Sequence, residues 1–451
     1  MRIISLTNFL SKGFEKFVMK WLLSYIAHKI DRNQFGGLKG NSVTHYLVEL
    51  INFILYNQDL KDPHAVLATL VEFSKAFNRV NHNIVITTLS KMGVPGWLLK
   101  IVASFLSERE LIVRFKGRTS SRQKMPGGGP QGSILGCFVF LILINYLGQS
   151  QPVNIGKHIT TSMNKRKPLE KNVSKYIDDF TVAVSINLKN CLEKDLNCTE
   201  PRPLNYHSRT EHILPRHNNK MQDELDSLKR YADENEMVIN QGKTKVILFN
   251  NRKSYDFLPK LMLSNNEYLE VVEEVKLLGL IIRSDLSWQA NTDNMCKKAY
   301  SRLWVIRRLK QLGAEQEELT DVYRQQILSI LEFAVPVWTP GLTQKQIHQI
   351  ERVQKTALYV ILGEHFTTYK VGLKLLKLET LKNRRQSLCT KFTTKVTQHE
   401  KFCSWFNERD QSHPFRTSSI PNKYKYIETR TNRFKNSPIP YITNIANSIY
   451  S

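Results

Sequence analysis

The chain has 451 residues, of which 41% are hydrophobic, and this excludes a wholly disordered polypeptide. It carries 65 Lys and Arg against 40 Asp and Glu, which gives a formal net charge of +25. Such an excess favours nucleic acid as the partner over an acidic membrane surface. The six cysteines show no C-x-x-C spacing, which argues against zinc knuckles and disulfide frameworks and indicates a reducing compartment inside the cell. The longest apolar run, 134–147, is too short to span a bilayer, and we expect no membrane partner.

The hydrophobic spacing predicts an α+β fold. In chain order it predicts helices over 7–31 and 42–56, a buried strand over 65–71, a helix over 83–107, a hairpin over 110–118, helices over 133–147 and 221–236, and strands over 245–249 and around 276–282. The polar, basic segments 149–172 and 191–217 are interpreted as insertions. From about 296 to 396 the pattern is mainly helical with basic faces, and 411–451 shows little periodicity.

Two segments carry acids where metal chemistry would need them. Asp178 and Asp179 stand side by side in Tyr176-Ile177-Asp178-Asp179-Phe180, and the strand over 65–71 ends at Glu72. Carboxylates at the ends of neighbouring strands are able to hold Mg²⁺, and two such ions serve phosphoryl transfer. Taken alone, an aspartate pair is more often a solvated turn, and Glu72 is equally compatible with a surface acid at a strand end.

The glycine-rich loop 127–132 lies between these two segments. Its glycines would let the backbone approach a ligand, and Gln131 is able to hydrogen-bond to a sugar, base or phosphate. The helix that begins near Ser133 would point its N-terminus at an anion. A plain turn is the alternative for this loop.

In order and spacing these segments resemble one family. Glu72 followed by Ser74-Lys75-Ala76-Phe77, then Gly129-Pro130-Gln131-Gly132-Ser133-Ile134-Leu135-Gly136, then Tyr176-Ile177-Asp178-Asp179 is similar to the reverse transcriptase of non-LTR (LINE-type, jockey-like) retrotransposons. Further similar segments are 2–6, 34–37, 240–245, the primer-grip match 277–279, 331–338 and 354–358. The resemblance implies an RNA-directed DNA polymerase that takes an RNA template, a DNA primer, dNTPs and two Mg²⁺ ions, with Mn²⁺ as a substitute.

The resemblance also implies a right-hand polymerase with an antiparallel palm sheet and a helical thumb and C-terminal region. Its parts would be partial fingers at 1–64, a palm with interleaved fingers elements at 65–289, a helical thumb and connection at 290–400, and a basic tail at 401–451. The chain starts at the family's second fingers motif. We therefore expect an N-terminally truncated polymerase that lacks the endonuclease domain and does not nick DNA.

Residue by residue, the resemblance implies a catalytic and metal-binding set of Glu72, Asp178 and Asp179, with Lys243 as general acid to pyrophosphate. Arg2 would contact the triphosphate, Phe77 would exclude a ribose 2′-hydroxyl, Gln131 would line the nucleotide site, and Tyr176 would pack against the primer end. A core Phe77, a solvated Lys243 and a structural Tyr176 remain open alternatives.

Nucleic-acid contacts are expected from the primer-grip residues and from one basic helix. The helix would turn Ala299, Leu303, Ile306 and Leu309 to the core and its bases outward. In the tail, aromatic residues alternate with bases, which suits stacking on single strands or docking on the thumb. The expected contact residues are Leu278, Gly279, Lys297, Lys298, Arg302, Arg307 and Arg308, and the tail aromatics are Phe415, Tyr424, Tyr426 and Phe434.

The chain departs from the family at its first catalytic acid. The family has Asp where this chain has Glu72, Asp where it has Asn78 and Asn81, and Pro where it has Ile3. A displacement of about 1 Å from the productive geometry costs on the order of 10²-fold in rate. The sequence therefore indicates a weakened polymerase, with a catalytically inactive nucleic-acid-binding remnant as the alternative. An RNA-templated RNA polymerase is disfavoured by Phe77.

Overall fold

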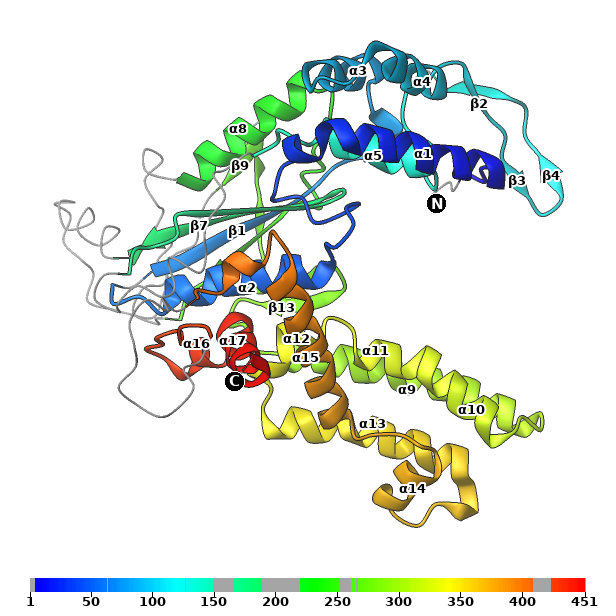
Figure 1. Cartoon of the computed structure of the whole chain (residues 1–451), viewed down its shortest axis with the longest axis vertical. Helices are drawn as coiled ribbons and strands as arrows, with labels where there is room; N and C mark the ends of the chain where they lie inside the picture. The colour runs from blue at the N-terminus through cyan, green and yellow to red at the C-terminus, as the bar shows by residue number, and fades with distance from the viewer. Residues whose placement is uncertain are drawn as a thin grey trace.

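The computed structural model of the chain (Figure 1) describes residues 5–62, 64–125, 127–148, 166–188, 220–251, 261–264, 267–408 and 423–450. Several sequence expectations lie outside the described residues. They are Arg2 and Ile3, the insertion at 191–217, the 149–165 part of the other insertion, and the tail residue Phe415.

A five-stranded sheet forms the centre of the molecule, in the order β11-β8-β1-β7-β6. Strand β1 pairs antiparallel with both β7 and β8, β6 pairs antiparallel with β7, and only β11 runs parallel to its neighbour β8. The strands are β1 (His64–Glu72), β6 (Lys171–Tyr176), β7 (Asp179–Asn187), β8 (Lys245–Phe249) and β11 (Glu270–Val271).

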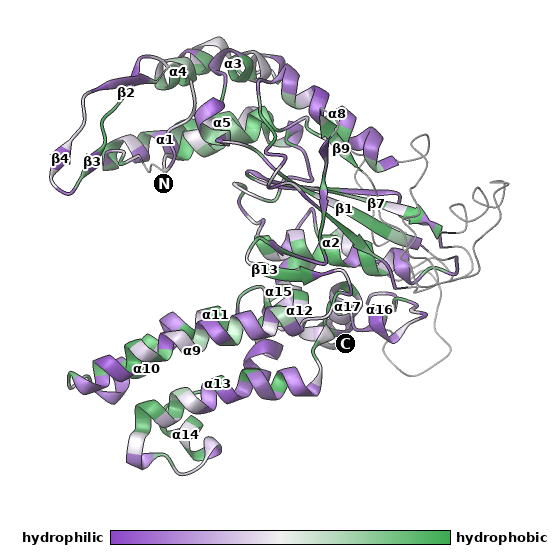
Figure 2. Cartoon of the chain, turned by 180° about the vertical axis from the view of Figure 1, so that it is seen from behind, coloured by the Kyte–Doolittle hydropathy of each residue, from purple (hydrophilic) through white to green (hydrophobic). Residues whose placement is uncertain are grey.

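Strand β1 is buried on both faces, which explains why its sequence is apolar without alternation. Val66 and Ala68 belong to the core beneath the sheet, whereas Leu67 and Val71 belong to the core above it. Helix α2 (Val43–Gln58) covers the lower face, and its Tyr46 hydroxyl donates to Thr181 Oγ1 at 2.5 Å. Figure 2 shows hydrophobic residues along both α2 and the strands.

The core above the sheet is closed by an upper helical layer of α1 (Phe9–Ile26), α3 (His82–Lys91), α4 (Gly96–Leu106), α5 (Ile134–Leu143) and α8 (Lys220–Glu234). The single helix expected over 83–107 is wrong, because α3 and α4 are separate. Gly93 has a φ of 81°, a left-handed conformation that ends α3, and Pro95 caps the start of α4. The other four predicted helices are confirmed.

Within the part of the chain that the structure describes, short strands make up three hairpins outside the main sheet. The predicted hairpin at 110–118 is longer than expected, because its base pairs β2 with β5 and its tip pairs β3 with β4. The strands are β2 (Arg109–Leu111), β3 (Arg114–Phe115), β4 (Arg118–Thr119), β5 (Gln123–Met125), β9 (Met262–Ser264), β10 (Glu267–Tyr268), β12 (Glu274–Leu277) and β13 (Leu280–Arg283).

Below the sheet lies a lower helical part that extends away from it (Figure 1). Its α-helices are α9 (Gln289–Gln311), α10 (Gln316–Val322), α11 (Ser329–Leu331), α12 (Val335–Trp338), α13 (Gln344–Leu362), α14 (Tyr369–Leu375), α15 (Leu381–Gln398), α16 (Asn432–Lys435) and α17 (Pro438–Tyr450). A π-helix, η5 (Tyr323–Leu328), joins α10 to α11, and 3₁₀ turns are η1 (Ala27–Lys29), η2 (Ala76–Arg79), η6 (Thr339–Gly341), η7 (Gly363–His365) and η8 (Cys403–Trp405). In the described ranges, no helix combines the length and the apolarity needed to cross a bilayer.

The C-terminal segment differs from the basic tail expected at 401–451, in which residues 411–451 show little periodicity in the sequence. Residues 432–450 form α16 and α17, and α17 packs against α2 and α15. Phe434, Ile439 and Ile442 are fully buried in the lower core. Part of the expected tail is therefore core, and Phe434 is not available for stacking on a nucleic acid.

Candidate active site

The ends of four strands bring the expected catalytic segments together. Strand β1 ends at Glu72, β6 ends at Tyr176, β7 begins at Asp179 and β8 begins at Lys245. Because these strands are antiparallel, the end of one meets the start of the next at the same edge of the sheet. In the β1–β7 register Glu72 stands directly opposite Asp179. The sequence expectation that Glu72 meets the aspartate turn across a sheet is therefore met.

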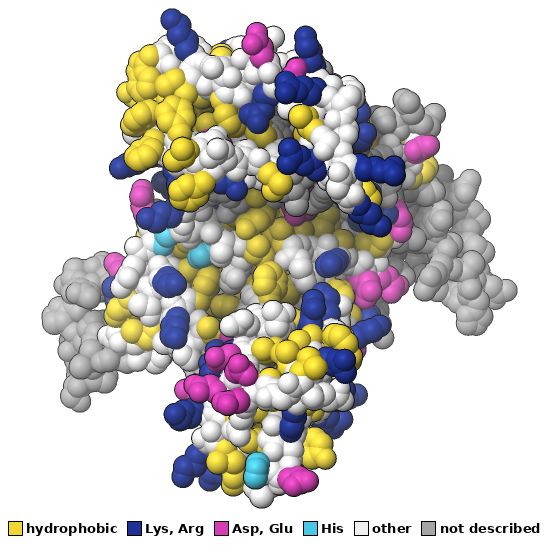
Figure 3. Space-filling model, turned by 90° about the vertical axis from the view of Figure 1, so that its right-hand side faces the viewer, with side chains coloured by type: hydrophobic (Ala, Val, Ile, Leu, Met, Phe, Trp, Pro, Cys, Tyr) yellow, Lys and Arg dark blue, Asp and Glu magenta, His cyan; other side chains and the backbone are white. Residues whose placement is uncertain are grey.

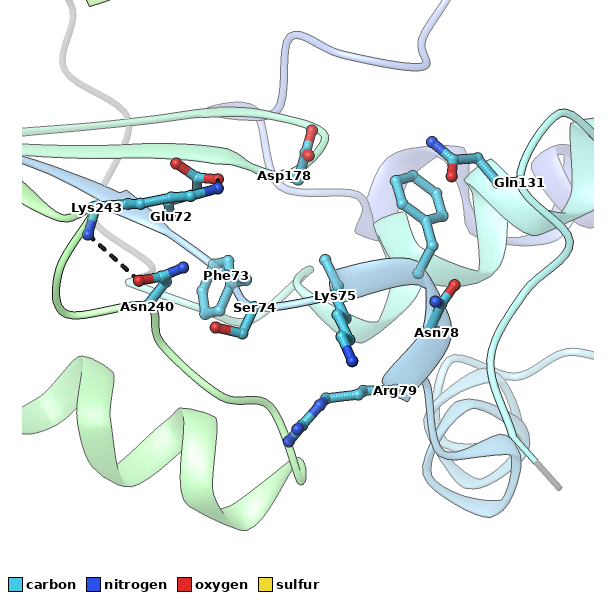
Figure 4. A pocket seen from close by; sticks show the side chains of 12 residues that line it. Glu72, Phe73, Ser74, Lys75, Asn78, Arg79, Gln131, Asp178, Asn240 and Lys243 are labelled. Atoms are coloured by element: carbon cyan, nitrogen blue, oxygen red, sulfur yellow. Dashed lines mark hydrogen bonds and ion pairs between the residues drawn. The ribbon is translucent and has the colours of Figure 1, made fainter. Parts of the chain in front are cut away.

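A cavity of about 490 Å³ opens at this edge of the sheet (Figure 4). It brings together Glu72, Phe77, Gln131, Asp178 and Lys243 of the expected site, whereas Tyr176 and Asp179 are not among its lining residues. The remaining lining residues are Phe73, Ser74, Lys75, Ala76, Asn78, Arg79 and Asn240. Lys75 and Arg79 are exposed cations that the sequence analysis did not single out, although both closely follow Glu72 in the chain.

The aspartate turn is supported from below by the loop at 33–37. Phe35 N–H donates to Lys175 O at 2.8 Å, and Lys175 N–H donates to Asn33 O at 2.9 Å. Ile177 adopts a left-handed φ of 58°, and a Cβ on Gly36 would lie 2.7 Å from its backbone nitrogen. The loop therefore needs glycine at this position so that it can support the turn.

Two cationic residues that precede the aspartates in the chain, Arg166 and Lys175, have side chains inside the protein. Lys175 is buried, makes an ion pair with Asp31 at 2.6 Å, and donates to the carbonyls of Ile144 and Asn145. Burial lowers the pKa of this lysine. Arg166 is also buried and pairs with Asp59 at 2.8 Å. These two cations stabilise the fold and are not positioned to contact nucleic acid.

Lys243 forms an ion pair with Glu72, the residue that differs from the family pattern. Its Nζ lies 2.6 Å from Glu72 Oε1, with the two side chains 61% and 39% exposed. The backbone also joins the two segments, because Asn240 N–H donates to Glu72 O at 2.7 Å, and Lys243 N–H donates to Asn240 Oδ1 at 3.3 Å (Figure 4). An exposed ion pair contributes about 0–1 kcal/mol. That is too little to hold the carboxylate against a divalent cation.

The glycine-rich loop approaches the chain itself. Gly128 N–H donates to Val80 O at 2.9 Å and Gly129 N–H donates to Phe77 O at 2.7 Å. A Cβ on Gly128, whose φ is 86°, would lie 2.9 Å from the carbonyl oxygens of Phe77 and Asn78. The glycines therefore seat the loop against the turn that follows β1, and in this way they position Phe77 and Gln131 on the same cavity.

The anion expected at the N-terminus of α5 is one of the chain's own side chains. The buried Glu15 carboxylate of α1 accepts from Ile134 N–H at 2.7 Å and from Leu135 N–H at 3.0 Å, and Ser133 Oγ accepts from Gly136 N–H at 2.9 Å. The helix terminus is thus satisfied internally. Interpreting it as an anion site for a ligand was wrong.

Two positions near the cavity have structural contacts as well. Phe77 is half-buried and its ring lies 5.1 Å from that of Phe140, so it is both a packing residue and a wall of the cavity. Asn81 caps α3, because its Oδ1 accepts from Asn83 N–H and Ile84 N–H. An asparagine performs this capping as well as an aspartate does.

Comparison with known proteins decides the family. Residues 1–282 match the family described as reverse transcriptase (RNA-dependent DNA polymerase), which is more than half of the 451 residues. The chain belongs to the reverse transcriptase family. The predicted resemblance is therefore confirmed at the level of the family.

Relatives of this reverse transcriptase come from mobile elements of Drosophila melanogaster. The RNA-directed DNA polymerase from mobile element jockey is 23% identical over 407 residues, which cover 88% of this chain and 39% of that protein. The probable RNA-directed DNA polymerase from transposon BS is 28% identical over 191 residues, covering 42% and 20% respectively. The chain thus spans at most about two fifths of the length of these relatives, and they confirm its likeness to jockey-like non-LTR elements.

Solved telomerase structures from Candida tropicalis superpose on this reverse transcriptase only loosely. One, in complex with a fragment of telomeric RNA, has a TM-score of 0.40 and 10% identity and covers 97% of this chain and 53% of that one. An apo form has a TM-score of 0.40 and 11% identity and covers 86% and 58%. Scores this low support no functional comparison.

The acids of the cavity suit a metal that also binds substrate. Within the described residues, no three His, Cys, Asp or Glu side chains gather into a complete metal site. However, Mg²⁺ is commonly bound through one or two carboxylates together with waters and substrate phosphates. Glu72 and Asp178 on one cavity are a donor set of that kind.

The expected nucleic-acid contacts lie on α9 and on the β12–β13 turn. As predicted, Ala299, Leu303 and Ile306 of α9 are buried and Leu309 is half-buried. Leu278 and Gly279 form the turn, with left-handed φ angles of 47° and 96°. Gly279 shares a cavity of about 300 Å³ with Lys298 of α9, whereas the half-buried Leu278 does not line it. The bases Lys297, Lys298, Arg302, Arg307 and Arg308 are all exposed.

Proposed function

We propose that this chain is an RNA-directed DNA polymerase that transfers nucleotides from dNTPs to a primer 3′-hydroxyl on an RNA template, as its mobile-element relatives are named to do. One observation carries the proposal. Glu72 and Asp178, which are far apart in the sequence, open into a single cavity together with Phe77, Gln131 and Lys243.

Two Mg²⁺ ions, or Mn²⁺, would be held by Glu72 and Asp178, with Asp179 in register beside Glu72. Such ions, when bound, lower the pKa of the attacking hydroxyl and neutralise charge on the phosphates. Glu72 would hold such an ion with the carboxylate that is now paired with Lys243. The Lys243 ammonium would then be available to donate a proton to the leaving pyrophosphate.

The nucleotide would lie against the wall formed by Phe77 and Gln131. The Phe77 ring, held by Phe140, excludes a ribose 2′-hydroxyl by shape, and Gln131 hydrogen-bonds to the nucleotide. Lys75 and Arg79, with Arg2 outside the described residues, supply positive charge for the triphosphate. Tyr176 would pack against the primer end.

For the whole chain we propose the right-hand layout of fingers at 1–64, palm at 65–289, and thumb and connection at 290–400. Figure 3 shows a hollow across one face, between the upper and lower helical parts, with Lys and Arg side chains on both sides. The template–primer duplex would lie there. Its backbone would be contacted by Leu278 and Gly279 and by the α9 bases Lys297, Lys298, Arg302, Arg307 and Arg308.

Primer extension on an RNA template with Mg²⁺ or Mn²⁺ tests this proposal. Native protein, Glu72→Asp and Asp178→Ala should be compared. We expect weak extension by the native chain, roughly tenfold to a hundredfold more by Glu72→Asp, since its carboxylate is one methylene shorter, and none by Asp178→Ala. Extension that survives Asp178→Ala would show that the site is assigned wrongly.

One observation favours a second candidate, a nucleic-acid-binding remnant without catalysis. The longer Glu72 side chain is paired with Lys243. In that case neither native protein nor Glu72→Asp extends a primer, although both still bind template–primer duplex. The same assay therefore separates the two functions.

A further inference from the structure

We infer that the groove between α13 and the segment that follows it is a second nucleic-acid site, which binds an unpaired strand. The groove measures about 620 Å³ and lies wholly outside the matched residues 1–282. Its lining residues are His348, Glu351, Arg352, Lys355, Thr356, Tyr359, Phe366 and Tyr369. The inference goes beyond the proposed polymerase reaction, because it concerns binding alone and holds for an inactive chain as well.

The sequence of α13 aligns the cationic and aromatic side chains along one face. His348, Arg352, Lys355 and Tyr359 are spaced by four, three and four residues, which places them in a single stripe along the helix. All four are exposed, and Tyr359 is 61% exposed.

The stripe points away from α9. Helix α9 lies on the other side of α13, where Cys296 and Gln289 contact Gln349, and Lys310 Nζ donates to Val360 O at 2.8 Å. In both ribbon views α9 lies between α13 and the upper helical layer (Figures 1 and 2). The groove is therefore separate from the surface proposed for the template–primer duplex.

The only acid among the lining residues is satisfied within the protein. Glu351 accepts from the Tyr369 hydroxyl at 2.6 Å and from Lys382 N–H at 2.7 Å, where it caps α15. The negative charge of Glu351 is thus compensated by the N–H groups at the start of α15. Arg352 and Lys355 are left to set the charge of the groove, so a polyanion complements it.

The aromatic residues select an unpaired strand over a duplex. Tyr359 and Phe366 meet edge to face, with ring centroids 5.7 Å apart, and the Tyr359 ring presents an open surface. Bases stack on such rings only when they are not already stacked in a helix. Cations beside the rings contact the phosphates between successive bases. An acidic peptide would satisfy the cations and leave the rings without a stacking partner.

Fluorescence anisotropy with the full chain tests the site. The probes are a labelled oligouridylate RNA, the matching oligothymidylate DNA and a blunt duplex. Tyr359→Ala should weaken binding of a single strand about fivefold or more and leave duplex binding unchanged. The double variant Arg352→Ala/Lys355→Ala should lose two phosphate contacts. The slope of the logarithm of the single-strand binding constant against the logarithm of the salt concentration should therefore become shallower by about 1.4. Comparison of the RNA and DNA probes identifies the strand that is preferred.

The matched control is Lys391→Ala/Lys395→Ala, which removes two exposed cations from α15. Tyr359→Phe keeps the ring and should bind as the native chain does. If the groove variants bind single strands like native protein, or if the control loses as much affinity as they do, the inference is wrong. Unchanged thermal unfolding of Tyr359→Ala shows that any loss of binding is not a loss of fold.

Discussion

At the scale of single residues, a cluster of buried ionisable groups lies behind the aspartate turn. Lys401 Nζ sits 3.5 Å from the centroid of the Phe35 ring, and burial lowers the pKa of this lysine to about 8. Burial raises the pKa of Glu49, whose Oε1 accepts from Trp405 Nε1 at 3.1 Å. The neighbouring His45 stacks on Phe402 at 4.1 Å. The loop that supports the turn thus rests on groups whose charge depends on pH.

His45 should make the fold sensitive to acid. Burial, helped by the positive charges of His399 and Lys401, lowers the pKa of His45 from 6.5 to about 3. Between these two values the unfolded chain binds a proton that the folded chain does not. The free energy of unfolding should therefore fall as the pH drops from 6.5 towards 3, by up to about 1.4 kcal/mol per pH unit.

Urea denaturation at pH 7 and pH 5 measures this effect. His45→Phe keeps a ring against Phe402 and should remove the part of the pH dependence of the unfolding free energy that comes from protonation of His45. His28→Phe, an exposed position on η1, serves as the control and should behave as the native chain does. Equal losses of stability in native protein and His45→Phe would contradict the prediction.

At the scale of elements, the site depends on how loops are seated against strand ends. The turn between β6 and β7 rests on the loop at 33–37, and the glycine-rich loop rests on the turn after β1. Both contacts bring backbone against backbone with no room for a side chain. The position of Asp178 is therefore set by a glycine more than 140 residues earlier in the chain.

Gly36→Ala should disturb the aspartate turn. The new Cβ would lie 2.7 Å from Ile177 Cγ1 and N and 3.0 Å from Tyr176 C. Relief of this overlap should cost about 1–3 kcal/mol of stability. A shift of Asp178 by about 1 Å should lower primer extension on the order of 10²-fold.

Gly13→Ala is the matched control, because a Cβ at that position of α1 meets nothing within 4 Å. It should leave extension unchanged and stabilise the helix by about 0.5–1 kcal/mol. Thermal unfolding and primer extension on both variants check the pair. If Gly36→Ala unfolds and extends as Gly13→Ala does, the loop does not support the turn.

At the scale of the whole molecule, Asp59 ties the C-terminal segment to the sheet. It follows α2, and its carboxylate pairs with Arg166 at 2.8 Å and accepts from the backbone N–H groups of Arg430 and Thr431. The Arg166 guanidinium also lies 5.6 Å from the ring of Phe434. Three distant stretches of the chain thus meet at one buried carboxylate.

Asp59→Ala should therefore loosen the C-terminal segment. It leaves the buried Arg166 unpaired and removes the acceptor for two backbone donors, which together should cost about 3–5 kcal/mol. Glu110→Ala, which breaks the exposed pair with Arg122, should cost about 0–1 kcal/mol. Chemical denaturation checks these costs, and limited proteolysis should cut residues 423–450 faster in Asp59→Ala alone. Similar stability of the two variants would exclude Asp59 as the link.

Much of the fold and of the site could be predicted because the signals are local. The periodicity of 245–249 and 134–143 identified a strand and a helix, and the spacing of Glu72, Gln131 and Asp178 was enough to identify the family. The break between α3 and α4 was missed although Gly93 and Pro95 mark it. The helix α17 of the C-terminal segment was missed although Ile439, Ile442 and Ile445 follow helical spacing, and it is buried against α2, α12 and α15.

Residue types and their order along the chain were therefore sufficient to predict the reverse transcriptase family and the basic helix α9. They also identified Glu72 and Asp178 as candidate site acids, because each of these signals depends on neighbours in sequence. The ion-pair and hydrogen-bond partners of charged groups could not be predicted from the sequence. Glu15 at the start of α5, Lys175 on Asp31 and Arg166 on Asp59 are pairs between distant segments, and burial decides whether such a charge faces a ligand or the protein. Because desolvation makes an unpaired buried charge costly, packing determined which of the many cations remain available to nucleic acid.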